Sequence, residues 1–126
     1  MEDRIVINPD IFLPEIKRYA INNKPMYQDQ CVDLSYDVME MAQAWFDLKP
    51  WELGRPQDYD TMRECRISMK RYIATAIDYN DNTKAYNLIP SFIFRWIAGY
   101  LITYIVKLII DYYWDDLIIA IGIEEF

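Results

Sequence analysis

The most regular hydrophobic pattern in the chain runs from residue 27 to residue 48. Apolar residues recur there at alternating steps of four and three, which places them on one face of a helix. They are Tyr27, Cys31, Leu34, Val38, Met41, Trp45 and Leu48. The other faces carry acids, namely Asp29, Asp33, Asp37, Glu40 and Asp47. The pattern predicts an amphipathic helix over 27–48 with one buried side and one acidic side.

The same spacing returns after a stretch that two prolines and a glycine interrupt. Its apolar positions are Met62, Cys65, Met69, Tyr72, Ala76 and Tyr79, widened by Ile73 and Ile77. Asp60 is a candidate cap, and Thr61 with Glu64 three residues later forms the pattern of a capping box. We predict a second amphipathic helix over 60–79.

The sequence patterns that indicate a helix near the N-terminus are shorter. Pro14 suits the first turn of a helix and Glu15 suits its positive end, while the asparagines at 22 and 23 and Pro25 favour its termination. We predict a helix over 14–22. Residues 1–13 precede it as an arm or a strand, because residues 4–7, RIVI, are rich in β-branched side chains.

Residues 91–115 are apolar around almost their whole circumference. Their small, polar and charged positions fall four residues apart, and they are Ser91, Arg95, Gly99, Thr103, Lys107, Asp111 and Asp115. Each step of four advances only about 40° around a helix. The sequence therefore predicts a long helix with one narrow polar stripe, on which Lys107 and Asp111 are spaced as an ion pair.

Such a helix is buried in a core, an assembly or a membrane. Residues 92–110 are long enough to span a bilayer. Against a span, Arg95 and Lys107 lie inside that window, and each costs on the order of 2.5–3.5 kcal/mol at a helix centre. The two amphipathic helices also need a partner surface, which this helix supplies. We favour a buried helix and keep the single membrane span as the alternative.

We therefore expect a mainly α fold in a single domain over 1–126. The fold is a bundle of three to four helices, with helices over 14–22, 27–48, 60–79 and 91–121 and a long, largely buried C-terminal helix. We also consider short β segments at both termini. They would be formed by residues 4–7 and by residues 118–126, which are rich in β-branched side chains.

Composition narrows the chemistry. The chain has no histidine, which removes histidine-based general acid–base catalysis, histidine-activated nucleophiles and histidine metal ligands. Its net charge of −7 argues against non-specific binding of nucleic acid.

The first ten residues are acidic and have no apolar run of the length that a signal peptide needs. We therefore expect no signal peptide and a protein that stays in a reducing cytosol. We expect no catalytic residue, no cofactor and no metal.

Three groups of residues are candidate sites. Cys31 and Cys65 fall on the apolar stripes, which favours two small buried side chains over a redox pair. The acids at 29, 33, 37 and 40 favour a solvated helix face over a Ca²⁺ or Mg²⁺ site, because no EF-hand loop is present. The basic cluster at 63, 66, 70 and 71 either neutralises the acidic helix or contacts an acidic partner.

The long helix has more apolar surface than three short neighbours can cover, and a large exposed apolar patch marks a protein partner. Tyrosine and tryptophan are favoured as interface anchors. The interface candidates are Trp96, Tyr100, Tyr104, Tyr112, Tyr113, Trp114, Arg63, Arg66, Lys70 and Arg71.

The expected function is a non-enzymatic structural or adaptor subunit of a multi-protein assembly, either a homo-oligomer or part of a larger complex. In being small, acidic, histidine-free and helical with an aromatic helix, the chain resembles connector or ring subunits of tailed-phage particles. That resemblance implies a virion or cytoplasmic location. An acidic inhibitor that masks a nucleic-acid-binding protein, through the acidic face of 29–47, is the other alternative.

Overall fold

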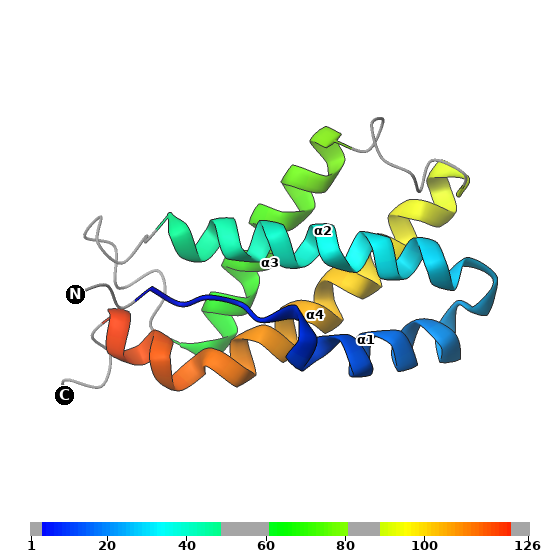
Figure 1. Ribbon diagram of the computed structural model, residues 1–126. Helices are drawn as coiled ribbons and strands as arrows, with labels where there is room; N and C mark the ends of the chain where they lie inside the picture. Colours follow the sequence, from blue (N-terminus) through cyan, green and yellow to red (C-terminus); the bar gives the residue numbers. More distant parts are fainter. Residues whose placement is uncertain (1–3, 49–60, 81–88, 122–126) are drawn as a thin grey trace.

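The computed structural model describes residues 4–48, 61–80 and 89–121. Within them four α-helices form a bundle, which confirms the predicted fold class: α1 (Pro9–Asn23), α2 (Gln28–Asp47), α3 (Met62–Asn80) and α4 (Ser91–Ile121). A 3₁₀ turn, η1 (Pro25–Tyr27), joins α1 to α2. These two helices lie antiparallel, α4 runs obliquely against both, and α3 crosses α2 on the far side in Figure 1.

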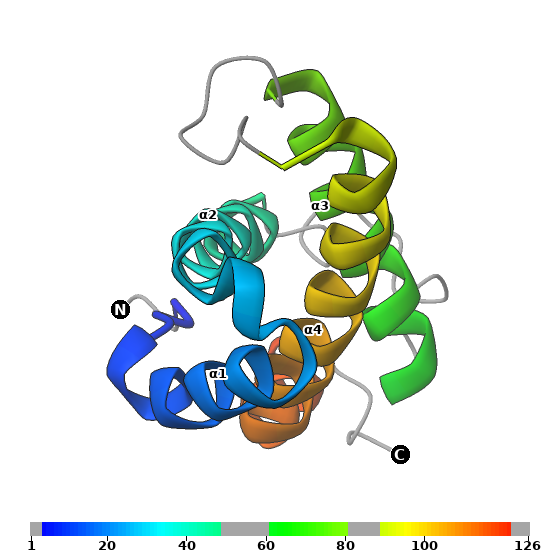
Figure 2. The ribbon, with the colours of Figure 1, turned by 90° about the vertical axis from the view of Figure 1, so that its right-hand side faces the viewer.

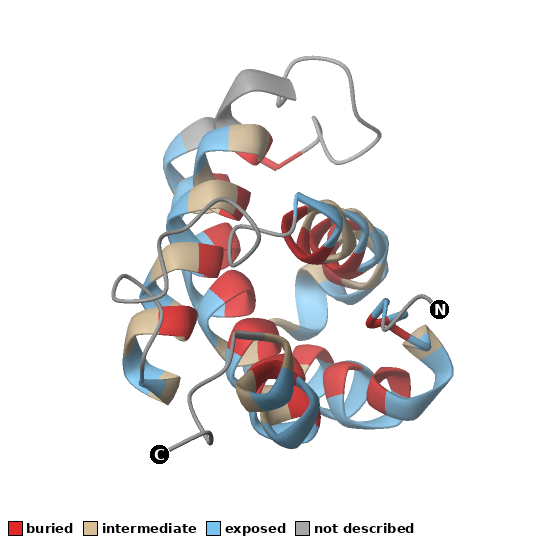
Figure 3. Ribbon diagram, turned by 90° about the vertical axis from the view of Figure 1, so that its left-hand side faces the viewer, coloured by how far each residue is buried: buried red, intermediate tan, exposed pale blue. Residues whose placement is uncertain are grey.

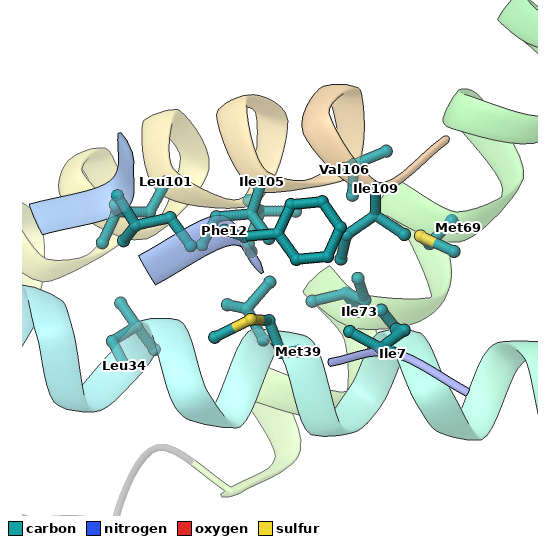
Figure 4. Close-up of a cluster of buried hydrophobic side chains, with 14 of the residues drawn as sticks. Ile7, Phe12, Leu34, Met39, Met69, Ile73, Leu101, Ile105, Val106 and Ile109 are labelled. Carbon is teal, nitrogen blue, oxygen red and sulfur yellow. The ribbon is translucent and has the colours of Figure 1, made fainter. Parts of the chain in front are cut away.

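The core is built around α4, as predicted. This helix contacts each of the other three and supplies seven of the twelve largest side chains that are fully buried, namely Ile97, Leu101, Ile105, Val106, Ile109, Ile110 and Leu117. Figure 4 shows four of them, Leu101, Ile105, Val106 and Ile109, beside Phe12 of α1, Leu34 and Met39 of α2, and Met69 and Ile73 of α3. The burial colours of Figure 3 show the same arrangement, with buried residues turned toward the centre of the bundle.

The first helix begins five residues earlier than the sequence predicted. Asn8 is its N-cap, and the Asn8 side-chain oxygen accepts a hydrogen bond from the Asp10 N–H at 3.1 Å. Pro9, and not Pro14, takes the first helical position, where a missing N–H costs nothing. The prediction of 14–22 was wrong at its start because two prolines competed for one role. Pro14 lies inside the helix and leaves the Asp10 carbonyl without its partner four residues on.

The other predicted helices agree with the structure within about two residues. α4 has the predicted bounds, and the capping box of α3 is confirmed. The Glu64 N–H donates to the Thr61 hydroxyl at 3.1 Å, and that hydroxyl donates to the Glu64 carboxylate at 3.1 Å. Asp60, the other candidate cap, lies outside the described residues.

The N-terminal segment is extended but pairs with no strand among the described residues. Ile5 and Ile7 are buried while Arg4 and Val6 are exposed, so the segment alternates as a strand does. Its partner is a side chain, because the Gln43 amide accepts from the Ile7 N–H at 2.8 Å and donates to the Ile5 carbonyl at 2.9 Å. The predicted β segment over residues 4–7 is therefore not formed. At the other end α4 continues to Ile121, and residues 122–126 lie outside the described residues.

Candidate protein-binding surface

The polar stripe of α4 forms the outer side of that helix, as its spacing predicted. Every described position on it is exposed, namely Arg95, Gly99, Thr103, Lys107, Asp111 and Asp115. The opposite side of α4 packs on α2 (Figure 2). The stripe therefore faces away from the core rather than into it.

A second line of residues, also four apart, runs beside this stripe. Phe92, Trp96 and Tyr100 have exposed fractions of 76%, 56% and 52%. The Trp96 and Tyr100 rings meet edge to face with centroids 5.4 Å apart, and the Lys24 ammonium lies 4.0 Å from the centre of the Trp96 ring. Three adjacent aromatic side chains are thus held in contact with solvent instead of being packed in the core.

Between α3, α4 and the end of α1 lies a hollow of about 560 Å³, which we call the α4 groove. Its lining residues are Tyr19, Lys70, Arg95, Trp96, Gly99, Tyr100, Thr103, Tyr104 and Lys107. Three of them are cations, and none of these lining residues carries a carboxylate. The groove is therefore basic and aromatic, in a chain whose net charge is −7.

Gly99 on the polar stripe leaves the groove open at this point. A Cβ atom placed on Gly99 would meet nothing within 4 Å. Glycine in a helix interior is less favourable than alanine by about 1 kcal/mol. The described part of the chain gains no packing in return, since no neighbour approaches the glycine. The Thr103 hydroxyl donates a hydrogen bond to the Gly99 carbonyl at 2.8 Å, so this side chain also lies close against the helix.

One wall of the groove is a pair of stacked tyrosines. The rings of Tyr19 and Tyr104 lie 4.1 Å apart and within 15° of parallel. Burial raises the pKa of both phenols above the ordinary value of 10.0, with further increases from Tyr100 for Tyr19 and from nearby Glu15 for Tyr104. Both therefore stay neutral below that value and present hydrogen-bonding hydroxyls.

A smaller cavity of about 240 Å³ adjoins the groove and shares Tyr19, Trp96 and Tyr100 with it. Cys31 lies at its inner side and is almost completely buried, as Cys65 is in α3, and both are free thiols. Burial raises the pKa of the Cys31 thiol, an effect that Lys24 partly opposes. The reactive thiolate is thus disfavoured, and the prediction of two small buried side chains agrees with the structure.

The predicted interface residues do not form one surface. Trp96 and Tyr100 are exposed on the groove and Tyr104 is half-buried in its wall. The remaining aromatics lie toward the other end of α4: Tyr112 is exposed, Trp114 is half-buried against the core, and Tyr113 is buried.

Tyr113 is therefore corrected from an interface candidate to a core residue. Its ring lies against Phe12 and Phe46 with centroids 6.0 Å away in each case. Its hydroxyl donates to the Val6 carbonyl at 3.1 Å and accepts from the Asn8 N–H at 3.3 Å, which ties the N-terminal segment to α4.

The four basic residues of the α3 cluster also lie in different places. Lys70 lines the groove, whereas Arg63 and Arg71 are exposed elsewhere on the helix. Arg66 forms an ion pair with Asp111 of α4. Asp111 therefore binds across to α3, where the sequence had suggested a pairing with Lys107 along the same helix.

The predicted acidic face forms the outer side of α2. Asp29, Asp33 and Glu40 are exposed and Asp37 is half-buried, and α2 contains no lysine or arginine. Lys17 of α1 lines the same hollow as Asp29 and Asp33. In the described ranges no three acidic or thiol side chains lie close enough to hold a metal ion.

Sequence reasoning missed three contributors to this surface, namely Phe92, Tyr19 and Lys24. Phe92 could have been found, because it shares the four-residue spacing of Trp96 and Tyr100. Tyr19 and Lys24 are more than seventy residues from the aromatic side chains that they contact, Tyr104 and Trp96. Only the packing of α1 on α4 brings them to the groove.

Residues Phe92–Ala120 also meet the length and composition of a membrane span, with half of the most apolar window buried inside the bundle. The core helix of a water-soluble protein meets the same criteria, so this feature does not decide between the two. No protein-family model, characterised protein or solved structure matches the chain.

Proposed function

We propose that this protein is a non-enzymatic structural or adaptor subunit of a multi-protein assembly, and that the α4 groove and its exposed aromatics are the contact surface. The observation that carries the proposal is the line of Phe92, Trp96 and Tyr100. Large aromatic side chains contribute most of the free energy of association when a partner buries them, and contribute little when they stay in water.

The composition of the outer side of α4 favours a protein partner over lipid. Arg95, Lys107, Asp111 and Asp115 share that side with the aromatics. A bilayer would have to accommodate those charges in or near hydrocarbon. A protein surface can pair them, and interface rims are polar and charged around aromatic anchors. The ring or connector subunits of a viral particle, which the sequence resembles, are the class of assembly that we propose.

The test is the mass of the purified protein in solution. We expect the wild-type chain to sediment as a multiple of 15.2 kDa. The variant Phe92→Gln/Trp96→Gln/Tyr100→Gln should sediment as a monomer, because the anchors are removed while the core residues of α4 are untouched. Val6→Gln/Met26→Gln/Leu48→Gln is the matched control, since these three exposed apolar side chains line neither the groove nor the acidic side of α2. A wild-type protein that stays monomeric at every concentration would reject self-assembly.

A further inference from the structure

The α4 groove and the outer side of α2 carry opposite charges. The α4 groove holds Lys70, Arg95 and Lys107, and Lys24 stands beside it over Trp96. The exposed acids of α2, at 29, 33 and 40, form the oppositely charged surface. Opposite charges on two surfaces steer association and set its register. The acidic side of α2 therefore has the charge that the groove would accept.

The two charged lines also match in length. Arg95 and Lys107 are twelve residues apart on α4, and Asp29 and Glu40 are eleven residues apart on α2. At a rise of about 1.5 Å per residue, the first line spans about 18 Å and the second about 16 Å. Arg95 and Lys107 are about 120° apart around α4, whereas Asp29 and Glu40 share one side of α2, so a docked α2 helix would cross the groove obliquely to meet both cations.

Gly99 lies between those two cations and removes the obstacle to close approach. Since no side chain of this chain occupies the space above it, a second backbone can come near at that point. Trp96 and Tyr100 flank the glycine, and their rings would pack against the apolar parts of the side chains on the docked helix. The unfavourable helical glycine is thereby explained by a contact made outside the chain.

The two surfaces belong to different elements. The groove is lined by residues of α1, α3 and α4, whereas the acids are on α2, which packs on α4 (Figure 2). A contact between two different surfaces joins copies head to tail, and it generates a ring if the rotation closes and a filament if it does not.

We infer that the α4 groove of one copy receives the acidic outer side of α2 from a second copy of this chain, so that copies associate head to tail. This inference rests on the proposed function and adds to it the identity of the partner and the geometry of the contact.

The test is a charge-reversal mixing experiment on the full chain. One variant, Arg95→Glu/Lys107→Glu, makes the groove acidic, and the other, Asp33→Lys/Glu40→Lys, makes the α2 surface basic. The matched controls are Arg63→Glu/Arg71→Glu and Asp115→Lys/Asp116→Lys, which change the net charge equally with residues outside both surfaces. Circular dichroism verifies the helix content of each protein, and sedimentation velocity gives its mass.

Each reversed variant alone should be monomeric, because its groove and its α2 surface then carry the same sign. Mixing the two should restore assemblies, since every groove now meets an α2 surface of opposite sign, and both controls should assemble as the wild type does. Reversed variants that assemble like the wild type, or a mixture that stays monomeric, would overturn the head-to-tail contact. In either case an assembled wild type would leave the proposed function standing, whereas a wild type that stays monomeric at every concentration would reject self-assembly, on which this inference rests.

Discussion

At the scale of single residues, the structure replaces several expected backbone partners with side chains. Gln43 serves the N-terminal segment as a neighbouring strand would, through one accepted and one donated hydrogen bond. The Tyr113 hydroxyl does the same one residue along, at Val6 and Asn8, and Arg4 binds Asp47 through two hydrogen bonds of 2.8 and 2.9 Å. The side chains of Gln43, Tyr113 and Asp47 thus fix a segment that pairs with no strand in the described part of the chain.

The first prediction concerns Gln43. In the Gln43→Ala variant the Ile7 N–H and the Ile5 carbonyl lose their partner in a half-buried site, so the free energy of unfolding should fall by about 1–3 kcal/mol. Gln43→Glu tests the donor by itself, because its carboxylate still accepts from Ile7 but faces the Ile5 carbonyl and the Asp47 carboxylate, to which the Gln43 amide donates at 2.9 and 3.0 Å. Its loss should therefore be at least as large as that of the alanine variant. Urea unfolding followed by circular dichroism measures both, and an unchanged midpoint for the alanine variant would contradict the role assigned to Gln43.

The second prediction concerns pH and the Tyr19–Tyr104 stack. Both phenols have a pKa above the ordinary value of 10.0 in the folded protein, chiefly through burial. The unfolded chain therefore loses these protons first, so the stabilising contribution is complete below pH 10 and is lost as the pH rises through the folded values.

Replacement of both residues by phenylalanine should keep the stack and reduce the loss of stability in alkali. Urea midpoints at pH about 8 and about 11, on either side of the ordinary phenol pKa, measure this difference. Tyr36→Phe removes an exposed hydroxyl away from the stack and is the control. An alkaline loss as large in the double variant as in the wild type would show that the stack is not its source.

At the scale of helices, local spacing predicted most of the architecture. α2, α3 and α4 were recognisable because their apolar residues recur every three or four positions, and because Thr61 and Glu64 mark a helix start. The start of α1 was missed since Pro9 and Pro14 both suit a first turn. The anchoring of residues 4–7 by Gln43 could not be predicted, because it joins positions 36 to 38 residues apart that only the packed bundle brings together.

The candidate surface, too, could be predicted only where it depends on spacing along one helix. The polar stripe of α4 was predicted correctly because it is the only polar line on that helix. Tyr112 and Tyr113 could not be distinguished, since both belong to apolar faces and the sequence does not show which face α1 and α2 will cover. In the structure Tyr113 is enclosed by Phe12 and Phe46, while Tyr112 meets Phe12 only with its edge and stays exposed.

At the scale of the molecule, the described helices bury one side of α4 and leave most of the other side exposed. The core accounts for Ile97, Leu101 and Ile105, which are almost fully buried. It does not account for Trp96 and Tyr100 in contact with water, or for a glycine in mid-helix with open space above it. All three features become favourable together if a second backbone lies along the groove.

The measurement that tests this account most directly is sedimentation velocity of the Gly99→Gln variant beside the wild type. Glutamine is a good helix former and adds neither charge nor an apolar surface, so the isolated chain should gain about 0.5–1 kcal/mol of stability. Its side chain nevertheless fills the space where we place the partner's backbone. We predict that the wild type assembles and that the variant is monomeric although it is more stable. Assembly of the Gly99→Gln variant equal to that of the wild type would contradict the account.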